Sequence, residues 1–536
     1  MSSKRRGTLN RGIDTTLATP APGSSFVRSA VRSAARITDH AHTPTNSEMH
    51  GRIRREAAVT THMEVVMRAL RQKVRLTWLV ASVLVLIGPL SSAAQTPPLT
   101  YNAMTDRLVH LMPALLTLGG AGFQFTDPTF GSKMLRVTDA NTRPDRVGRF
   151  FMSPSSAEST AWNTNSTKFY VMGSGGEQIP YNFNPATMTS SRMAPLGNGS
   201  GGLVLNFNGE PTFSFVDPDL IYSGSGSVFV SYRFSTAIQT ALHDVGSCLP
   251  GITLHALNVS ISKDDQQFLA YIGGASQDAD TTVYVYDKTK GCRWMNTQTG
   301  QVGGQWGPTG TYTGDKSLTL HNARLSKGGQ FARLVTSNGG AGTYYWDIGT
   351  LNLVACPENA GPNYCSGHAV MGFTKAINQR QVGDAMDFAI RPMSTPNSGT
   401  LFPGLISPLL TPAQWVVDTH PSWNNVQSDE KQPVCMEVYR TDNIVQRAWD
   451  GEIICAAMDG SFKVWRFAHH RSNVANLFWD QPRANVSQDG RFVMFTSNWG
   501  GTVGTGPDGA RQDAFIVQLA AGSTTPASSP TNLTLQ

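Results

Sequence analysis

The sequence predicts an all-β protein, a seven-bladed β-propeller with a short N-terminal helix, and three observations lead to this fold class. Glycine is abundant, with 52 residues in a chain of 536, and only 15% of the residues are charged, as suits short strands joined by tight turns. A unit of strand, turn and apolar strand recurs along the chain. Its spacing matches that of propeller blades.

The recurring unit is clearest near the end of the chain. Residues 485–497 read NVSQDGRFVMFTS, and related units surround Ser262 and Ser326, with a degenerate one from Trp162 to Val171. Each reads as a strand, a turn built on Asp, Gly or Asn, and an apolar strand. Further units are centred on the segments 228–230, 381–391 and 435–438.

The spacing of the units sets the number of blades. Phe169 and Phe492 hold corresponding places in the first and last units, and the 323 residues between them make six steps of about 54. Seven such units suit blades of four short strands. The alternatives are a β-helix and a single two-sheet sandwich. Repeats of about 54 residues are too long for the coils of a β-helix, and the whole chain is too long for one sandwich.

These units resemble the WD40-like, TolB-type propeller repeat, whose theme is S-x-D-G followed by apolar residues. The resemblance spans roughly residues 125–519 and is best in the last copy and around Ser262 and Ser326. It implies the propeller fold and leaves the function open, since propellers include both enzymes and binding scaffolds.

The first 94 residues are expected to lie outside the mature fold. Residues 63–94 have the layout of a signal peptide: basic residues up to Arg75, an apolar run from Leu76 to Ile87, and small residues up to Ala94. A membrane anchor is the alternative, but the apolar run is short for a span and Gly-Pro interrupts it. We interpret residues 1–62 as disordered or as a misassigned gene start.

The charge balance follows from this division. Residues 1–75 hold 14 of the 43 Lys and Arg and 5 of the 37 Asp and Glu, so the remainder carries 29 basic and 32 acidic residues, a net charge of −3. The mature part therefore shows no basic excess for nucleic acid. We expect a protein that is secreted, periplasmic or on the cell surface, without a membrane span in its mature form.

Cleavage at this signal peptide is our first prediction. N-terminal sequencing of the exported protein should begin at or near Gln95, because small residues precede that position. Recovery of the exported protein with Met1 intact would contradict the cleavage.

The remaining chain divides into three parts. Residues 95–122 are expected to form a lead-in with a helix over 101–117, residues 123–519 the propeller, and residues 520–536 a flexible Ser/Thr/Pro-rich tail. The six cysteines all follow the signal peptide, and export with an even count predicts disulfides. Of fifteen possible connectivities we favour sequential pairing, and the absence of any CxxC spacing argues against zinc.

Polar residues recur just before the first strand of several units, where propeller blades approach the central channel. They are Glu158, His255, His321, His368, His420 and Gln481. Imidazoles from several blades could share a divalent metal ion, so the four histidines and Gln481 are the candidate ligands. The alternative is that these histidines bond backbone or water. The polar residue lies 7, 5 and 6 positions before the matched serine in three units, and a one-residue slip reverses a strand residue's face.

Three further residues are candidates for catalysis. Arg324 and Arg483 lie beside His321 and Gln481 and could hold a substrate carboxylate; the alternative, slightly favoured, is a surface or inter-blade ion pair. His470 lies in the polar segment FAHHRSN, a candidate site at the rim or a solvated loop.

This arrangement resembles oligogalacturonate lyases, propellers with a central divalent metal held by His and Gln. The segment DTHPSW, with His420, matches part of their metal motif. The resemblance implies a secreted, metal-assisted lyase acting on a uronic-acid polysaccharide, in which a cation makes the C5 proton acidic and a base removes it. The alternative is a non-catalytic propeller that binds an extracellular protein or a glycan.

Overall fold

The structure is a computed structural model that describes most of residues 96–519. Within this range it leaves out residues 196–201, 255, 277, 358–364, 366–367, 383–384, 403–416, 442–444, 446, 475–477 and 508. The described residues belong to one compact unit, residues 91–536. The predicted signal peptide, the extension before it and the C-terminal tail lie outside the described residues.

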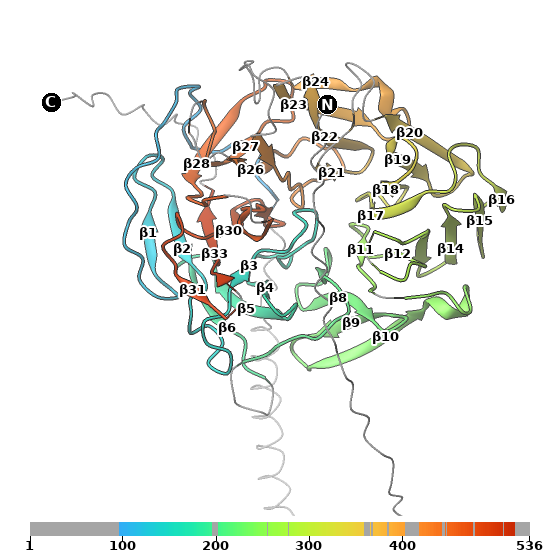
Figure 1. Ribbon diagram of the computed structural model, residues 1–536, viewed down its shortest axis with the longest axis horizontal. Helices are drawn as coiled ribbons and strands as arrows, with labels where there is room; N and C mark the ends of the chain where they lie inside the picture. The colour runs from blue at the N-terminus through green and yellow to red at the C-terminus, as the bar shows by residue number, and fades with distance from the viewer. Residues whose placement is uncertain are drawn as a thin grey trace, which may run out of the picture. The chain divides into compact units, whose positions relative to one another are not determined.

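The described residues form seven antiparallel sheets arranged around an axis, as Figure 1 shows, so the predicted seven-bladed propeller is confirmed. From the axis outward, the strands of blades 1 to 3 are β3 (Phe151–Met152), β4 (Lys168–Gly173), β5 (Gln178–Asn184) and β6 (Thr189–Arg192); β7 (Thr212–Phe213), β8 (Leu220–Ser225), β9 (Val228–Arg233) and β10 (Ile238–Asp244); and β11 (Ser260–Ile261), β12 (Gln267–Ile272), β13 (Thr282–Asp287), β14 (Gly291–Asn296), β15 (Gln301–Gly304) and β16 (Gly310–Thr311).

Blades 4 to 6 have four strands each. They are β17 (Thr319–Leu325), β18 (Phe331–Asn338), β19 (Gly342–Asp347) and β20 (Asn352–Pro357); β21 (Ala369–Met371), β22 (Lys375–Val382), β23 (Ala385–Pro392) and β24 (Thr400–Phe402); and β25 (Val417–Thr419), β26 (Val434–Arg440), β27 (Glu452–Ala456) and β28 (Val464–His469). The described residues also include three 3-10 turns: η1 (Val245–Ser247), η3 (Pro396–Ser398) and η4 (Phe478–Asp480).

Blade 7 joins the two ends of the propeller sequence. Its inner strands are β29 (Asn485–Val486), β30 (Phe492–Ser497) and β33 (Asp513–Gln518), and its outer strands are β2 (Lys133–Arg136) and β1 (Gln124–Thr126). A small hairpin, β31 (Thr505–Gly506) with β32 (Gly509–Ala510), precedes β33. Because β2 pairs with β33, early and late segments close the ring within one sheet.

The serine of the repeat unit closes the turn between the first two strands of a blade. The hydroxyls of Ser262, Ser326 and Ser487 each accept a hydrogen bond from the backbone N–H five residues later, at 2.9, 3.0 and 3.0 Å. Gly329 and Gly490 in these turns have φ values of +75° and +67°, which a residue without a Cβ adopts at low cost. The repeated motif is thus a turn signal.

The other predicted units fall on different strands of their blades. The segment 228–230 lies in β9, the third strand of blade 2, whereas 435–438 lies in β26, the second strand of blade 6. The segment 381–391 spans the end of β22 and most of β23. The spacing of about 54 residues is therefore an average over units that fall on different strands of their blades.

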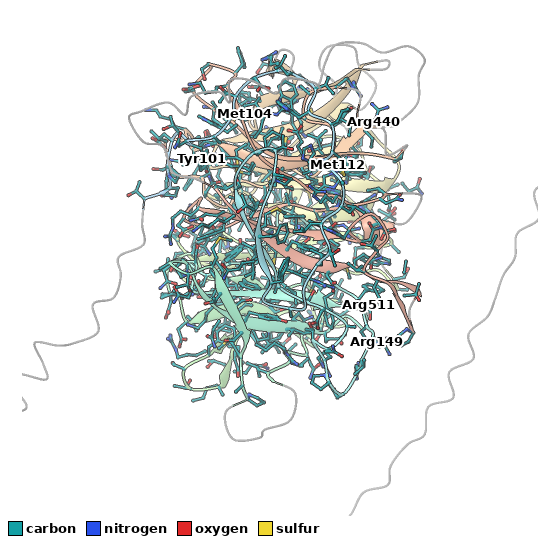
Figure 2. All side chains as sticks on the ribbon, turned by 90° about the vertical axis from the view of Figure 1, so that its left-hand side faces the viewer. Tyr101, Met104, Met112, Arg149, Arg440 and Arg511 are labelled. Atoms are coloured by element: carbon teal, nitrogen blue, oxygen red, sulfur yellow. A yellow bond between two sulfur atoms is a disulfide. The ribbon has the colours of Figure 1, made fainter. Side chains whose placement is uncertain are left out.

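The helix predicted over residues 101–117 is not formed; this segment, here called the N-terminal strap, has no regular helix hydrogen bonds. Its backbone carbonyls instead accept bonds from side chains of blades 6 and 7: Arg466 bonds the carbonyl of Leu108 at 2.9 Å, and Trp499 that of Leu116 at 2.9 Å. Figure 2 labels Tyr101, Met104 and Met112 along the strap. The helix predicted from the Met/Leu spacing is wrong because side chains of blades 6 and 7 bond the backbone carbonyls that helix hydrogen bonds would otherwise use.

Large aromatic residues fill the spaces between blades. Trp162 stacks on Phe492 of blade 7, with ring centroids 6.0 Å apart, and donates to the carbonyl of Asn485 at 3.2 Å. Trp423 and Trp499 are also buried. These tryptophans therefore pack the core and are not exposed to stack on sugars, whereas Trp479 is 41% exposed.

The three predicted disulfides are present in the structure. They join Cys248 to Cys292, Cys356 to Cys365, and Cys435 to Cys455, with Cα atoms 6.6, 5.5 and 4.0 Å apart. The third bridges directly paired residues of β26 and β27. Three bridges are compatible with an extracellular or periplasmic location. Among the described residues, no helix has the length and apolarity needed to cross a membrane.

Candidate active site in the axial cavity

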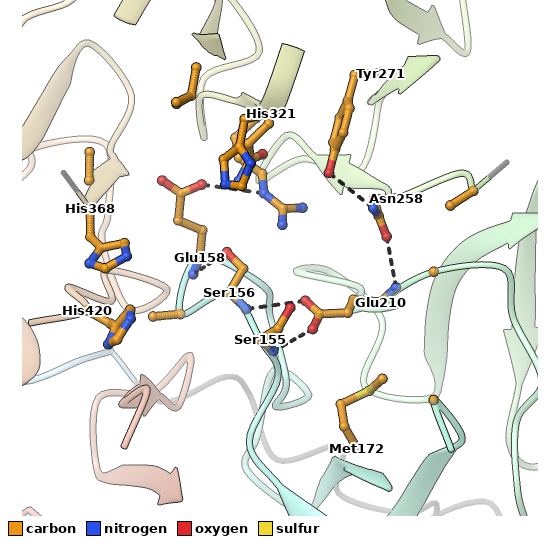
Figure 3. A pocket seen from close by; sticks show the side chains of 18 of the residues that line it. Ser155, Ser156, Glu158, Met172, Glu210, Asn258, Tyr271, His321, His368 and His420 are labelled. Atoms are coloured by element: carbon orange, nitrogen blue, oxygen red, sulfur yellow. Dashed lines mark hydrogen bonds and ion pairs between the residues drawn. The ribbon is translucent and has the colours of Figure 1, made fainter. Parts of the chain in front are cut away.

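A cavity of about 620 Å³ opens where the inner strands of the blades begin. It is lined by residues of blades 1 to 6 and by Phe478, which precedes blade 7. Figure 3 shows its charged and polar groups, which converge from the blade 1 loop and from blades 2 to 6. Its acidic, basic and imidazole side chains are those of Glu158, Glu210, His321, Arg324, Arg333, His368 and His420.

Three of the predicted metal ligands line this one cavity. They are His321 before the middle of β17, His368 immediately before β21, and His420 immediately after β25. Gln481 is not among the lining residues, and His255 lies outside the described residues. The structure thus brings three of the five candidate ligands, from blades 4, 5 and 6, to one cavity.

His368 and His420 form a pair at one side of the cavity. Their ring centroids are 4.1 Å apart. His368 Nδ1 lies 3.1 Å from a carboxylate oxygen of Asp418 and 2.9 Å from the carbonyl oxygen of Thr419, while His420 Nδ1 contacts the carboxylate of Glu437. Since these partners are all acceptors, Nδ1 carries the proton in both rings and Nε2 is the basic nitrogen of the neutral forms.

The two histidines are shifted in opposite directions. Desolvation lowers the pKa of His420, and the neighbouring His368 lowers it further, against the opposing effect of Glu437. Desolvation also acts to lower the pKa of His368, but Asp418, Glu437 and the Thr419 carbonyl overcome it, so that this pKa is raised. Paired groups whose pKa values are driven apart are suited to separate base and acid roles.

The carboxylates behind the pair are themselves fixed. Asp418 accepts a hydrogen bond from the Tyr439 hydroxyl at 2.7 Å. Glu437 is fully buried and accepts bonds from the backbone N–H of His420 at 3.0 Å and of Ala484 at 2.6 Å. Neither carboxylate was a sequence candidate, although a glutamate within the apolar run VCMEVY is a signal that could have found Glu437.

Glu158 lies between two arginines on the floor of the cavity. Its carboxylate is 3.5 Å from Arg324 Nε and 3.4 Å from Arg333 Nη1. Arg324 and Arg333 are directly opposite each other in the β17–β18 ladder, and both are nearly buried. The cluster carries two guanidinium charges against one carboxylate, an excess of one positive charge. Sequence reasoning placed Arg324 here but missed Arg333.

Glu210 holds the loop that carries Glu158. Its carboxylate accepts bonds from the backbone N–H of Ser155 at 2.5 Å and from the Ser159 hydroxyl at 3.0 Å, as Figure 3 shows in part. The backbone N–H of Glu210 in turn bonds the Asn258 side chain at 3.2 Å. The position of Glu158 is therefore set by blades 2 and 3.

His321 lies apart from the histidine pair. Its side chain is 52% exposed, and its Nδ1 lies 2.5 Å from a carboxylate oxygen of Asp278. It belongs to an irregular part of β17, where the pairing with β18 skips this residue. It can therefore contact a bound molecule at the open side of the cavity.

The other two catalytic candidates lie outside the cavity lining. Arg483 is fully buried, with its guanidinium 4.1 Å from the centre of the Phe478 ring, and burial lowers its pKa to about 10. His470 is 2% exposed; its Nε2 lies 3.3 Å from the Val438 carbonyl and its Nδ1 accepts from the backbone N–H of Ser472. Burial lowers the pKa of His470 to about 3. Both side chains are placed to support packing.

The described residues do not form the predicted multi-ligand metal site. Within the described part of the chain, no group of three or more His, Cys, Asp or Glu is arranged to hold a metal ion. The cavity histidines are instead each directed by Nδ1 onto a carboxylate. This arrangement can supply a proton acceptor, a proton donor and a positively charged floor.

Comparison with known proteins adds likenesses of fold. The chain matches no family model and no curated protein. Oligogalacturonate lyase from Vibrio parahaemolyticus is 9% identical over 74% of this chain and 96% of its own, with a TM-score of 0.43. TolB from Acinetobacter baumannii is 15% identical over 60% and 64%, TM-score 0.29, and the C-terminal WD40 domain of Sif2 13% over 67% and 80%, TM-score 0.33. The propeller assignment rests on the seven sheets themselves.

Proposed function

We propose that this protein is a secreted carbohydrate-active propeller that cleaves a uronic-acid polysaccharide by β-elimination in its axial cavity. One observation carries the proposal: His368 and His420, each backed by a carboxylate, lie side by side in an open cavity that also contains the Glu158–Arg324–Arg333 cluster. An extended polymer can enter such a cavity from the mouth of the channel. A sugar carboxylate would find a positive floor there.

The chain's own side chains match the needs of the elimination. His420, neutral at neutral pH, takes the C5 proton on Nε2. The electrons of the C–H bond form the C4–C5 double bond as the C4–O bond breaks, and the electron pair leaves with the glycosidic oxygen. Protonated His368 donates its proton to that oxygen, and Arg324 with Arg333 offsets the negative charge that develops at the sugar carboxylate.

A divalent metal ion stays a separate prediction. Two imidazoles, His368 and His420, lie close enough to act together, but the described residues supply no third ligand beside them. The steps above therefore use the protein side chains alone, and elemental analysis of the purified protein tests the metal prediction directly.

The second candidate function is a non-catalytic propeller that binds a glycan or an extracellular protein. It is favoured by the extent to which the cavity groups already pair with one another, as Glu158 does with two arginines and His321 with Asp278. Such pairing is also what a preformed binding surface needs.

Incubation of the purified protein with uronic-acid polymers tests the proposed function. We expect the absorbance band of unsaturated uronate to appear with an acidic polymer and not with a neutral glucan of similar length. A parallel incubation with a chelator distinguishes metal-dependent from metal-independent cleavage. Tight binding of acidic polymers without any unsaturated product, over the full set of polymers and with divalent metals added, would contradict the lyase and establish the binding propeller.

A further inference from the structure

A second, much smaller cavity lies on the axis next to the first. Its volume is about 20 Å³, enough for one water-sized or halide-sized group. It shares Glu158 and Arg324 with the larger cavity, and its other polar lining includes Lys327, Thr212 and Ser260. Glu158 and Arg324 thus face both cavities, whereas Lys327, Thr212 and Ser260 have no role in the proposed elimination.

Two lysines come together beside the small cavity. Lys327 is 8% exposed, and its Nζ lies 4.7 Å from the centre of the Phe215 ring. Lys263 Nζ lies 5.4 Å from the same centre. Their hydrogen bonds go to neutral groups, the side-chain oxygen of Asn424 for Lys327 at 3.1 Å and the Val426 carbonyl for Lys263. In the part of the chain that the structure describes, neither forms an ion pair with a carboxylate.

The axial groups around the small cavity therefore have an excess of positive charge. The charged side chains that line it are Lys327, Arg324 and Glu158, with a net charge of +1. Two more cations lie next to these residues: Arg333, which also pairs with Glu158, and Lys263, which faces the same Phe215 ring as Lys327. Burying unpaired charge is costly unless a partner neutralises it.

Two further observations concern the hydrogen bonding and the protonation of these cations. Arg324 Nε is buried and makes no hydrogen bond among the described residues; the Glu158 oxygen with which it forms an ion pair lies 3.5 Å away and likewise makes no hydrogen bond there. Burial, together with Lys327, lowers the pKa of Lys263 to about 7, and burial lowers the pKa of Lys327 to about 8. Without a nearby anion, both lysines would thus hold their protons weakly at neutral pH.

We propose that the small axial cavity binds a single halide-sized anion between Lys327 and Arg324. The ammonium of Lys327, the guanidinium of Arg324 and the hydroxyls of Thr212 and Ser260 are the donors that line it. The Ser260 hydroxyl oxygen already accepts from the backbone N–H of Leu325 at 2.8 Å, so its own proton can be directed at the anion. This binding is separate from the proposed elimination and would hold equally in a non-catalytic propeller.

Thermal unfolding in two salts at equal ionic strength tests the proposal. We expect Tm to be higher in 0.2 M potassium chloride or bromide than in potassium gluconate by about 2–5 °C, because an anion bound only by the folded state stabilises it. Gluconate is too large for the cavity. Lys327→Met should abolish the halide dependence, whereas Lys431→Met, at an exposed lysine, should retain it.

A diffraction experiment on the unmodified protein tests the same proposal without relying on the folding of the Lys327→Met variant. Crystals of the unmodified protein soaked in bromide should show an anomalous peak in the small cavity, within about 3.5 Å of Lys327 Nζ. A Tm that is equal in bromide and gluconate, or a bromide-soaked crystal with no anomalous peak in the cavity, would overturn the proposal. Neither result bears on uronate cleavage, so the two proposals can fail separately.

Discussion

Replacing His420 by alanine should lower kcat/KM for the uronic-acid polymer by about 10²–10⁴-fold, the usual contribution of a positioned general base. His420 is the neutral member of the histidine pair, and its Nδ1 is fixed by Glu437. The propeller should remain folded, because the disulfides and the blade ladders do not involve this side chain. Initial rates of unsaturated uronate formation measure the change, and circular dichroism checks the fold.

The pH profile of the unmodified protein distinguishes base from acid. Activity should fall at low pH as His420, whose pKa is lowered, becomes protonated, and at high pH as His368, whose pKa is raised, loses its proton. The profile should thus be bell-shaped with a plateau around the ordinary histidine pKa of about 6.5. His368→Ala should remove the alkaline limb.

His110→Ala is the matched control, since His110 lies on the N-terminal strap and pairs with Asp106. This variant should keep both the rate and the pH profile. If His420→Ala cleaves the polymer as fast as the unmodified protein, the assignment of the base is wrong.

Replacing Arg466 by methionine should lower the free energy of unfolding by about 3–5 kcal/mol, the range seen when one partner of a buried ion pair is removed. Arg466 and Glu452 are both fully buried and form a two-bonded pair at 2.8 and 2.5 Å. Arg466 also holds the strap through the Asp106 carboxylate at 2.6 Å. The variant leaves Glu452 without its cation. Urea unfolding measures the loss.

A second substitution tests the cause. Adding Glu452→Leu to Arg466→Met removes the unpaired carboxylate and should restore much of the stability. Arg233→Met removes an exposed pair with Asp217 at 2.8 Å and should change stability by about 0–1 kcal/mol. If Arg466→Met unfolds at the same urea concentration as the unmodified protein, the pair contributes nothing measurable.

The fold could be predicted from the sequence because its signals are local. The serine of each well-formed unit, the positive-φ glycine after it and the apolar strand that follows all act within about ten residues. The disulfides were predicted from the expected export and the even count of cysteines, and sequential pairing was chosen among fifteen connectivities. The prediction of a helix at 101–117 was wrong because the backbone carbonyls of this segment bond side chains more than 350 residues away, such as those of Arg466 and Trp499.

The candidate site could be predicted only in part because its geometry depends on irregularities and distant partners. His321 lies where the β17–β18 register shifts, so the spacing from Ser326 does not fix its direction. Glu158 contacts Arg333 across 175 residues of sequence, and no local sequence pattern predicts that contact. The carboxylate behind His368, Asp418, comes from the neighbouring blade, and the carboxylate behind His420, Glu437, comes from the second strand of its own blade.

The way blade 7 is assembled also decides when this molecule can finish folding. Arg136 of β2 meets Asp513 of β33 at 2.6 Å across 377 residues of sequence. Such a non-local contact carries a large loop-closure cost and forms late. Until β33 has been synthesised, β2 has no inner neighbour and keeps an open edge. We therefore expect the chain to be most open to proteolysis and aggregation in the interval before β2 and β33 pair.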